Sequence, residues 1–452
     1  MAERKLFGTD GVRGVANSYP MVPEVAMALG RAVAAVFKGK RGRTRILIGK
    51  DTRLSGYMFE TALESGVCSM GADAMLVGPL PTPGIAYMTV SMRADAGVVI
   101  SASHNEFEDN GIKFFGGDGF KLPDEVELQM EALVFDQSRL TVARGRDLGR
   151  AYRVDDATGR YCVFLKSLFP RECSLTGIRI AVDCANGAAY KVAPMVFAEL
   201  GAEVMAIGVD PDGTNINENC GALHPEALSR EVLEHRCDLG LALDGDGDRA
   251  ILCDEHGNVV DGDMVLALCA ERMQAEGTLK GRGVVGTIMS NLGLERALER
   301  LDLRLVRTDV GDRYVVEEMR RSGYNLGGEQ SGHLLFLDSA PTGDGILSCL
   351  KVLEVMVKTG EPLSKLTSSF ERFPQVQLSR KVREKPPIEA LSNVMAAVRA
   401  AEARLGSRGR VNVRYSGTSP LVRVMVEGED EGVIRSLAED ILAAAEQDGI
   451  AV

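Results

Sequence analysis

Three aspartates alternate with glycines in a short segment near the middle of the chain, at Asp244, Asp246 and Asp248, and Arg249 follows them directly. Glycine at the intervening positions lets the backbone turn sharply, so the three carboxylates can converge on one point. Carboxylate oxygens are ligands that suit Mg²⁺, which in proteins keeps open positions for water or for the phosphate oxygens of a substrate. The segment therefore predicts a catalytic loop that binds Mg²⁺.

Two other interpretations of this segment are possible. The aspartate spacing, with Glu255 after it, also matches most of a calcium-binding EF-hand loop. The EF-hand requires glycine where this chain has Arg249, and it requires flanking helices, whereas residues 240–243 and 250–253 are short apolar runs typical of buried strands. A solvated acidic turn that binds no metal is the other alternative.

A hydroxyl-rich loop follows another predicted strand, residues 98–100. It contains Ser101, Ser103 and His104, and Lys113 lies further along. A strand end that presents a hydroxyl, an imidazole and an ammonium could supply a nucleophile and groups for proton transfer. Loops rich in serine, asparagine and glycine are also common as ordinary turns, so this segment alone leaves both interpretations open.

Two glycine-rich segments near the C-terminal end add binding groups. The loop 327–333 offers a carboxylate, a hydroxyl and an imidazole, which could bind the hydroxyls of a sugar, at Glu329, Ser331 and His333. The turn 414–420 lies between two strand-like runs, and its arginine, hydroxyls and backbone N–H groups could bind phosphate. The candidate phosphate-binding residues are Arg414, Ser416, Gly417, Thr418 and Arg423.

These segments, in this order, resemble the motifs of the α-D-phosphohexomutase superfamily. The resemblance spans nearly the whole chain and includes the opening residues 7–14, Phe-Gly-Thr-Asp-Gly-Val-Arg-Gly. The opening segment and the Gly-Glu-Gln-Ser-Gly-His form of the sugar loop are most similar to members that act on phosphorylated amino sugars. The resemblance implies a reversible phosphoryl transfer on a small hexosamine phosphate.

The resemblance also implies roles for individual residues. Ser103 would carry the phosphoryl group and, with the three aspartates, hold Mg²⁺; it would phosphorylate O1 of glucosamine 6-phosphate. The 1,6-bisphosphate would turn around in the site and return its 6-phosphoryl group to Ser103. Positive charge on Arg13, Lys113 and Arg249 would neutralise the phosphoryl group. Arg13 and Lys113, with His104 and His333 nearby, would assist proton transfer.

The chain departs from the superfamily pattern at two positions. Glu106 stands where proline is usual after Ser-His-Asn, and the loss of the restricting ring should loosen the nucleophile loop. Ser419 stands where a glutamate is usual in the phosphate loop. Two alternatives therefore accompany the main hypothesis. One is the same chemistry on glucose or mannose phosphates, and the other is a non-catalytic protein that binds sugar phosphates.

The composition limits the class of protein. The chain has 452 residues, 45% of them hydrophobic and 26% charged, as in ordinary soluble proteins, and its formal charge is −12. The negative charge argues against nucleic acid as a partner, and no apolar run approaches a membrane span. Nine cysteines without a Cys-x-x-Cys pair suit reduced thiols in the cytoplasm. The oligomeric state stays open between monomer and homodimer.

Alternating apolar helices and short strands predict an α/β fold. We expect three similar α/β domains with mixed sheets and a smaller C-terminal α+β domain around a central cleft. The expected ranges, which carry the serine, metal, sugar and phosphate loops in turn, are 1–153, 154–256, 257–371 and 372–452. The last range predicts the order strand, helix, strand, strand, helix.

Two other glycine-containing segments resemble binding loops. Residues 281–286 match Gly-x-Gly-x-x-Gly but precede a predicted strand, whereas a dinucleotide-binding loop follows one. Residues 183–187 end a predicted strand and are equally compatible with a phosphate-binding loop and with a turn that packs against the metal loop. Neither segment is included in the predicted site.

Overall fold

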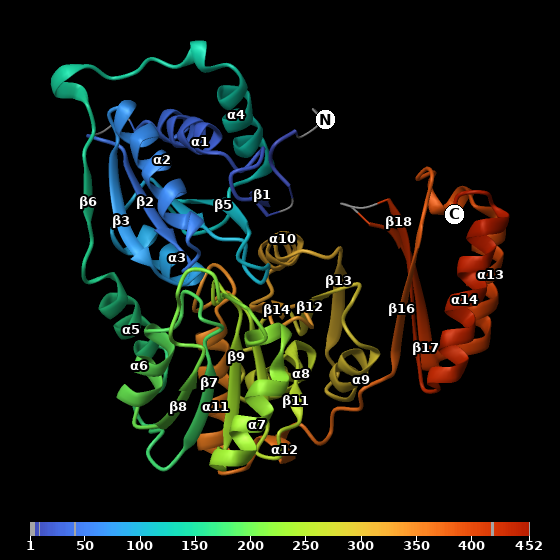
Figure 1. The fold of residues 1–452 in the computed structure, drawn as a ribbon. Coiled ribbons are helices and arrows are strands. Elements are labelled where there is room, and N and C mark those ends of the chain that lie inside the picture. The colour runs from blue at the N-terminus through green and yellow to red at the C-terminus, as the bar shows by residue number, and fades with distance from the viewer. Residues whose placement is uncertain (1–4, 9, 40–41, 417–419, 452) are drawn as a thin grey trace.

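Four sheets organise the computed structural model, which describes residues 5–8, 10–39, 42–416 and 420–451. Three sheets are mixed and lie in the main body of the molecule, and the fourth is antiparallel and lies in the C-terminal part (Figure 1). Among the described residues, no helix is both long enough and apolar enough to cross a membrane.

The first sheet has six strands and is covered by helices. Its strands, in spatial order, are β1 (Val12–Val15), β5 (Asp109–Gly116), β4 (Ala96–Ile100), β2 (Arg45–Lys50), β3 (Asp73–Pro79) and β6 (Ala151–Arg153). The helices of this part of the chain are α1 (Pro23–Val36), α2 (Ser55–Ser69), α3 (Thr82–Ser91) and α4 (Asp124–Phe135).

The second and third sheets follow in the chain. The second contains β11 (Val259–Val260), β10 (Ala250–Cys253), β9 (Leu239–Leu243), β7 (Arg179–Asp183) and β8 (Glu203–Ile207), with helices α5 (Ala157–Ser167), α6 (Val192–Glu199) and α7 (Pro225–His235). The third contains β13 (Arg304–Thr308), β12 (Gly283–Thr287), β14 (Leu326–Gly328) and β15 (Leu334–Phe336), with helices α8 (Gly262–Ala275), α9 (Leu292–Arg300), α10 (Asp312–Ser322), α11 (Gly345–Thr359) and α12 (Leu363–Leu366).

One path of the chain recurs in all three mixed sheets. A strand, a helix, a second strand, a helix, and then a third strand with an antiparallel return appear as β2 to β5, β7 to β10 and β12 to β15. The third strand pairs in parallel with the first strand of its unit each time. The loop before the antiparallel return holds residues 101–108, 244–249 or 329–333. The repeat thus places each chemically active loop at the equivalent point of its sheet.

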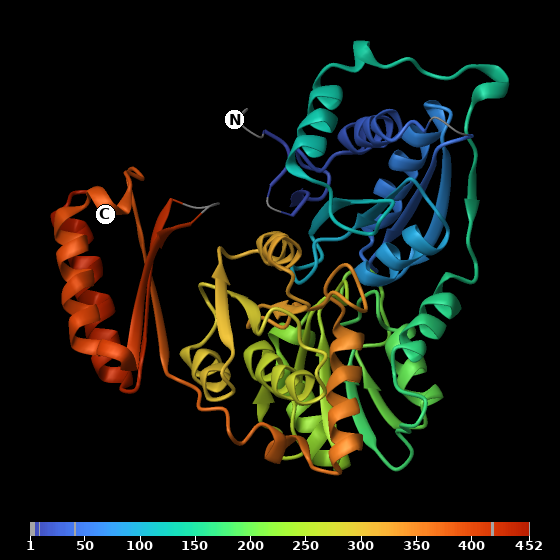
Figure 2. The ribbon, with the colours of Figure 1, turned by 180° about the vertical axis from the view of Figure 1, so that it is seen from behind.

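The apolar core links these units. A single cluster of buried residues runs from the first unit to the third, and helix α11 packs against β9 and β10 as well as against α8 and β15. Figure 2 shows α11 beside the strands of the second sheet, although it follows the third sheet in the chain. The second and third units therefore share one core.

The C-terminal part is a separate antiparallel sheet with its own core. Its strands, in spatial order, are β16 (Gln375–Lys381), β18 (Leu421–Gly428) and β17 (Gly409–Tyr415), and α13 (Ser392–Leu405) and α14 (Glu431–Gln447) cover one face. The buried carboxylate of Glu427 accepts a hydrogen bond from Leu292 N, and Arg410 donates to the carbonyls of Ile288 and Ser290. These contacts anchor one end of the sheet to the third unit.

The predicted fold class and the C-terminal element order are confirmed, and the differences are local. Residues 109–113 belong to strand β5, not to a loop, and the polar stretch 144–156 contains the edge strand β6, which pairs with β3. Helix α3 was not predicted, because its first turn reads Thr-Pro-Gly and resembles a turn. Proline in the first helical turn is compatible with a helix, since the N–H groups there have no partner within the helix.

Candidate active site

A cleft of about 500 Å³ opens between the first three units. Its walls carry side chains from each of the three loops and from the opening segment of the chain. The lining residues that the sequence predicted are Arg13, Ser103, His104, Asp248, Arg249, Glu329 and His333. The structure therefore brings together groups that lie more than two hundred residues apart in the sequence.

The three aspartates of the metal loop converge as predicted. Asp244, Asp246 and Asp248 are buried, and one carboxylate oxygen of each lies within 4.8 Å of the others. One oxygen of Asp246 and one of Asp248 are buried without a hydrogen-bond partner. Burial and the two neighbouring carboxylates raise the pKa of Asp244 well above its ordinary value. This donor set is suited to a divalent cation, which would neutralise the clustered negative charge.

Ser103 stands against this cluster. Its Oγ donates a hydrogen bond of 2.6 Å to Oδ2 of Asp244, and Nδ1 of His104 lies 3.2 Å from the same hydroxyl. Ser101, the other serine of the loop, turns its hydroxyl away from the cleft and donates to Asp51 at 2.6 Å. Of the two hydroxyls, only that of Ser103 contacts the metal loop.

Lys113 reaches the metal loop from the middle of β5. Its buried Nζ donates to Oδ2 of Asp246 at 3.0 Å and lies 3.1 Å from Oδ2 of Asp10. Burial alone would lower the pKa of Lys113, but Asp10 and Asp246 outweigh that effect and raise it. Thr82, at the start of α3, donates to the same oxygen of Asp246 at 2.7 Å. Asp246 is thereby oriented by groups from the first unit.

The two histidines of the cleft differ in their surroundings. Burial, together with the positive charges of Arg249 and Arg13, lowers the pKa of His104 to about 4. Burial works in the same direction at His333, but Asp248 and Asp312 dominate and raise the pKa of His333 to about 9. Nδ1 of His333 lies 3.5 Å from Oδ2 of Asp248, and its Nε2 lies 3.6 Å from Oδ2 of Asp312. The imidazole of His333 thus connects the sugar loop to the metal loop.

Two predicted sugar-loop residues are placed differently. Glu329 is nearly buried, lines the cleft and accepts a hydrogen bond from the backbone N–H of Gly311 at 3.1 Å. Ser331 is exposed and is not one of the residues that line the cleft. Glu329 directly follows strand β14 and lies on the cleft side, whereas the turn after it carries Ser331 outward.

The C-terminal arginines stand together on their sheet. Arg414 of β17 lies opposite Arg423 of β18, and the positive charge of Arg423 contributes, after burial, to lowering the pKa of Arg414. Ser416 is buried and its carbonyl accepts a hydrogen bond from Lys385. The predicted residues Gly417 and Thr418 lie outside the described residues.

The C-terminal sheet does not close the cleft. None of its described residues lines the cleft, and this part of the molecule stands apart from the first unit in both views (Figures 1 and 2). Arg414 and Arg423, which the sequence predicted to bind phosphate, therefore lie apart from the predicted residues that line the cleft.

Sequence reasoning missed an ionic network beside the cleft. Nζ of Lys121 lies 2.5 Å from Oδ1 of Asp10 and 2.5 Å from Oδ2 of Asp312. Asp10 also forms an ion pair with Arg13. The network spans the first and third units, and its partners are as much as 191 residues apart. Asp10 belongs to the opening motif and offered a signal, but Lys121 and Asp312 stand in no motif that the sequence singled out.

The loop 183–187 supports the metal loop. Ala188 N donates to the carbonyl of Gly245 at 2.8 Å, and a side chain on Gly187 would collide with the backbone of Gly245. The carboxylate of Asp183 accepts hydrogen bonds from the backbone N–H groups of Ala185 and Gly221. Of the two interpretations left open by the sequence, the structure favours the packing turn.

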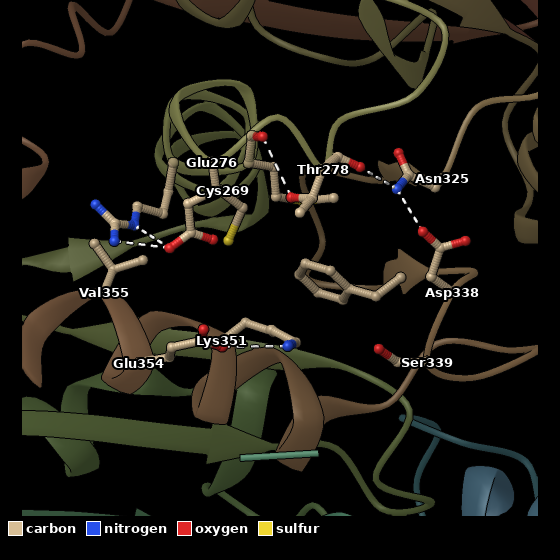
Figure 3. A pocket seen from close by; sticks show the side chains of 12 residues that line it. Cys269, Glu276, Thr278, Asn325, Asp338, Ser339, Lys351, Glu354 and Val355 are labelled. Atoms are coloured by element: carbon tan, nitrogen blue, oxygen red, sulfur yellow. Dashed lines mark hydrogen bonds and ion pairs between the residues drawn. The ribbon is translucent and has the colours of Figure 1, made fainter. Parts of the chain in front are cut away.

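A second cavity of about 300 Å³ lies between α8, α11 and the end of β15. Figure 3 shows its apolar groups and the polar side chains around them. Charged side chains that line the cavity form ion pairs with one another, as Arg272 does with Glu276 and Lys351 with Glu354. This cavity offers no counterpart to the nucleophile and carboxylate cluster of the cleft.

Comparison with protein families gives four matches in chain order. They are to the phosphoglucomutase/phosphomannomutase alpha/beta/alpha domains I, II and III and to the C-terminal domain, over residues 4–140, 160–257, 261–373 and 378–444. Together these matches cover most of the chain.

Individual relatives are similar over nearly their full length. The phosphoglucosamine mutase of Geobacter sp. (strain M21) is 60% identical over 446 residues, which is 98% of each chain. That of Anaeromyxobacter dehalogenans is 60% identical over 453 residues, covering 98% of this chain and 99% of the relative.

Solved structures share the fold. A phosphoglucomutase/phosphomannomutase family protein from Burkholderia thailandensis has a TM-score of 0.81 at 22% identity, covering 98% of this chain and 99% of the other. N-acetylphosphoglucosamine mutase from Aspergillus fumigatus, in complex with GlcNAc-6P and magnesium, has a TM-score of 0.69 at 18% identity, covering 99% and 96%.

Proposed function

The chain belongs to the phosphoglucomutase/phosphomannomutase family, and we propose that it interconverts glucosamine 6-phosphate and glucosamine 1-phosphate. The enzyme is an isomerase that works by phosphoryl transfer. The observation that carries the proposal is the hydrogen bond of 2.6 Å from Ser103 Oγ to Asp244, inside a cleft lined by the predicted sugar-loop residues Glu329 and His333.

A divalent cation fits the metal loop, and Mg²⁺ is the proposed ion. The three aspartates would hold it together with the group on Ser103, since unpartnered carboxylate oxygens of Asp246 and Asp248 lie in the same cluster. When bound, such a cation supplies positive charge that stabilises the phosphoryl group during transfer. Oxygen ligands alone, without histidine or cysteine, favour Mg²⁺ over softer metals.

The proposed reaction begins with a phosphoryl group on Ser103. In the first half, the Oγ–P bond breaks and a bond from phosphorus to O1 of glucosamine 6-phosphate forms, while O1 gives up a proton and the freed Oγ of Ser103 takes one up. The 1,6-bisphosphate then turns around. In the second half, the O6–P bond breaks and the Oγ–P bond forms again, while the hydroxyl of Ser103 gives up its proton and O6 takes one up, so that glucosamine 1-phosphate leaves.

The charged residues of the cleft have proposed roles in this transfer. Arg13 and Arg249 line the cleft beside Ser103 and would neutralise phosphate oxygens. Lys113, through its contact with Asp246, would add positive charge at the metal loop. Arg13 and Lys113 are also the proposed proton-transfer assistants, with His104 beside the serine hydroxyl.

The substrate would be held at both ends. Glu329, Ser331 and His333 are the proposed sugar-binding residues. The proposed site for the phosphate that does not react comprises Arg414, Ser416, Gly417, Thr418 and Arg423. The nearly buried carboxylate of Glu329 supports an amino-sugar preference, because a charge-assisted hydrogen bond to the substrate ammonium would be possible there.

Two measurements on the purified protein test the proposal. Intact-mass spectrometry should find a phosphoryl group on the wild-type chain and none on Ser103→Ala. Turnover should be faster on glucosamine 6-phosphate than on glucose 6-phosphate or mannose 6-phosphate. A protein that carries the phosphoryl group but prefers a neutral sugar would contradict the substrate assignment alone, whereas a protein that turns over none of the three would contradict the enzymatic role.

A further inference from the structure

Ser103 has an unusual backbone conformation for a residue other than glycine. Its φ is 55°, in the left-handed region, where a side chain costs free energy unless the surroundings hold it. The same loop has Glu106 in place of the proline expected from the resemblance, so no proline ring restricts it there. Other contacts must therefore keep Ser103 in this conformation.

Arg53, in the loop after β2, supplies most of these contacts. Its side chain is wholly buried. One terminal nitrogen donates to the carbonyls of Ser103 at 3.0 Å and Asn105 at 2.8 Å, and the other donates to the carbonyls of Glu106 and of Asp109 at 3.1 Å. A single planar guanidinium thus binds three carbonyl oxygens of the nucleophile loop and that of Asp109, the first residue of β5.

Asp51 completes the arrangement on the other side of Ser103. Its Oδ2 lies 2.8 Å from Nε of Arg53 and accepts a hydrogen bond of 2.6 Å from the hydroxyl of Ser101. That hydroxyl in turn accepts a hydrogen bond of 2.9 Å from the backbone N–H of Ser103. Both the N–H and the carbonyl of the nucleophile are therefore tied, directly or through Ser101, to one buried ion pair.

The second unit reinforces the same point. Asn217, in the loop after β8, donates from Nδ2 to the carbonyls of Ser103 and Asn105, at 2.9 Å in each case. The carbonyl of Ser103 consequently accepts from two side chains of different units. This places the nucleophile relative to the metal loop, which also belongs to the second unit.

We propose that Arg53 and Asp51 are positioning residues for phosphoryl transfer, which hold the backbone of Ser103 so that its Oγ stays against Asp244. The inference rests on the proposed function of Ser103 as the phosphorylated residue. Neither side chain needs to touch the substrate. A displacement of the nucleophile by ~1 Å would be enough to lower the rate of transfer by about a hundredfold.

A neighbouring buried ion pair provides a matched control. Lys50, at the end of β2, pairs with Glu60 of α2, and its ammonium lies 4.0 Å from the ring centroid of Tyr57 on the same helix. Both charged side chains are almost fully buried. Glu60→Gln therefore disturbs an ion pair of similar burial in the same region, but its partners lie on β2 and α2 and not on the nucleophile loop.

The test compares Arg53→Lys with Glu60→Gln in the full-length protein. Lysine keeps the charge but cannot bind four carbonyls at once, so we expect kcat to fall by about a hundredfold with KM for the sugar phosphate changed by less than about threefold. Glu60→Gln should lower the unfolding temperature while keeping most of kcat. Equal kcat values in the two variants, or a loss confined to KM, would overturn the inference.

Ser101→Ala gives a second test that does not depend on the folding of the arginine variant. It removes the acceptor for the N–H of Ser103, and we expect kcat to fall by about tenfold at unchanged KM. Wild-type kcat in Ser101→Ala would contradict the proposed tie. Each variant is compared with the wild type on whichever hexose phosphate the wild type converts, so an error in the proposed substrate leaves this test intact.

Discussion

Asp263, in the first turn of α8, offers a prediction whose size can be worked from its surroundings. Its side chain is fully buried, and its Oδ2 accepts a hydrogen bond of 2.6 Å from Asn291 N. Burial and the nearby carboxylate of Asp261 raise its pKa from 3.8 to about 8. The folded protein therefore holds a proton on Asp263 at neutral pH.

The direction of the pH dependence follows from this proton. Between pH 4 and 8 the folded state keeps it and the unfolded chain does not, so stability decreases as the pH rises through this window. A pKa difference of about 4 units corresponds to at most ~6 kcal/mol. Relaxation around the charged group reduces that value, and we expect a measured loss of ~2 kcal/mol or more.

Asp263→Asn should remove this loss, because the amide keeps an acceptor for Asn291 N and never ionises. Scanning calorimetry from pH 5 to pH 9 should show the unfolding temperature of the variant rising relative to the wild type as the pH increases. Asp302→Asn, at an exposed carboxylate of the same unit, should follow the wild type throughout. A difference between Asp263→Asn and the wild type that stays constant across the range would refute the reasoning.

Three further predictions concern the chemistry. Ser103→Ala should abolish turnover while the unfolding temperature stays near that of the wild type; retained activity would show that another group accepts the phosphoryl group. Asp246→Asn should weaken Mg²⁺ binding, measured by titration calorimetry, and cut turnover by orders of magnitude, as should EDTA; full activity in excess chelator would exclude the metal role. Glu329→Gln should reduce kcat/KM for glucosamine 6-phosphate more than for glucose 6-phosphate, by roughly 1.5 to 3 kcal/mol or about tenfold to a hundredfold, whereas Arg414→Ala should reduce both alike. An equal loss on both sugars in Glu329→Gln would mean that the preference is set elsewhere.

The loops of the site were predictable because each follows an apolar strand and carries a concentrated motif. Asp244, Asp246 and Asp248 stand at alternate positions of one short segment, so their convergence needs only a tight turn. The sequence identified Lys113 as a candidate but did not place it on a strand. Lysine is rare in buried strands, so the pattern there did not predict one. Asp246, the partner of Lys113, lies 133 residues away, and only the assembled fold brings the two together.

Arg53 illustrates what sequence patterns leave out. A single arginine in a polar turn is normally read as a solvated residue, and its burial depends on carbonyl groups that a sequence does not display. The sequence predicted three similar units, but it did not predict the order in which their strands pair. Strand order is set by backbone hydrogen bonds, so similar topologies need no similar residues at equivalent positions.

Because the C-terminal sheet is attached to the third unit at one end, a rotation about that end moves the far ends of strands β17 and β18. Arg410 on β17 and Glu427 on β18 hold one end against the third unit, and Arg414 on β17 and Arg423 on β18 each lie four residues further from that pivot. Four residues of strand span ~13 Å, so a tilt of ~15° would swing both guanidinium groups by ~3 Å. Small rotations at the pivot would therefore change the reach of the arginines by about the radius of a phosphate group, while the strands themselves stay rigid.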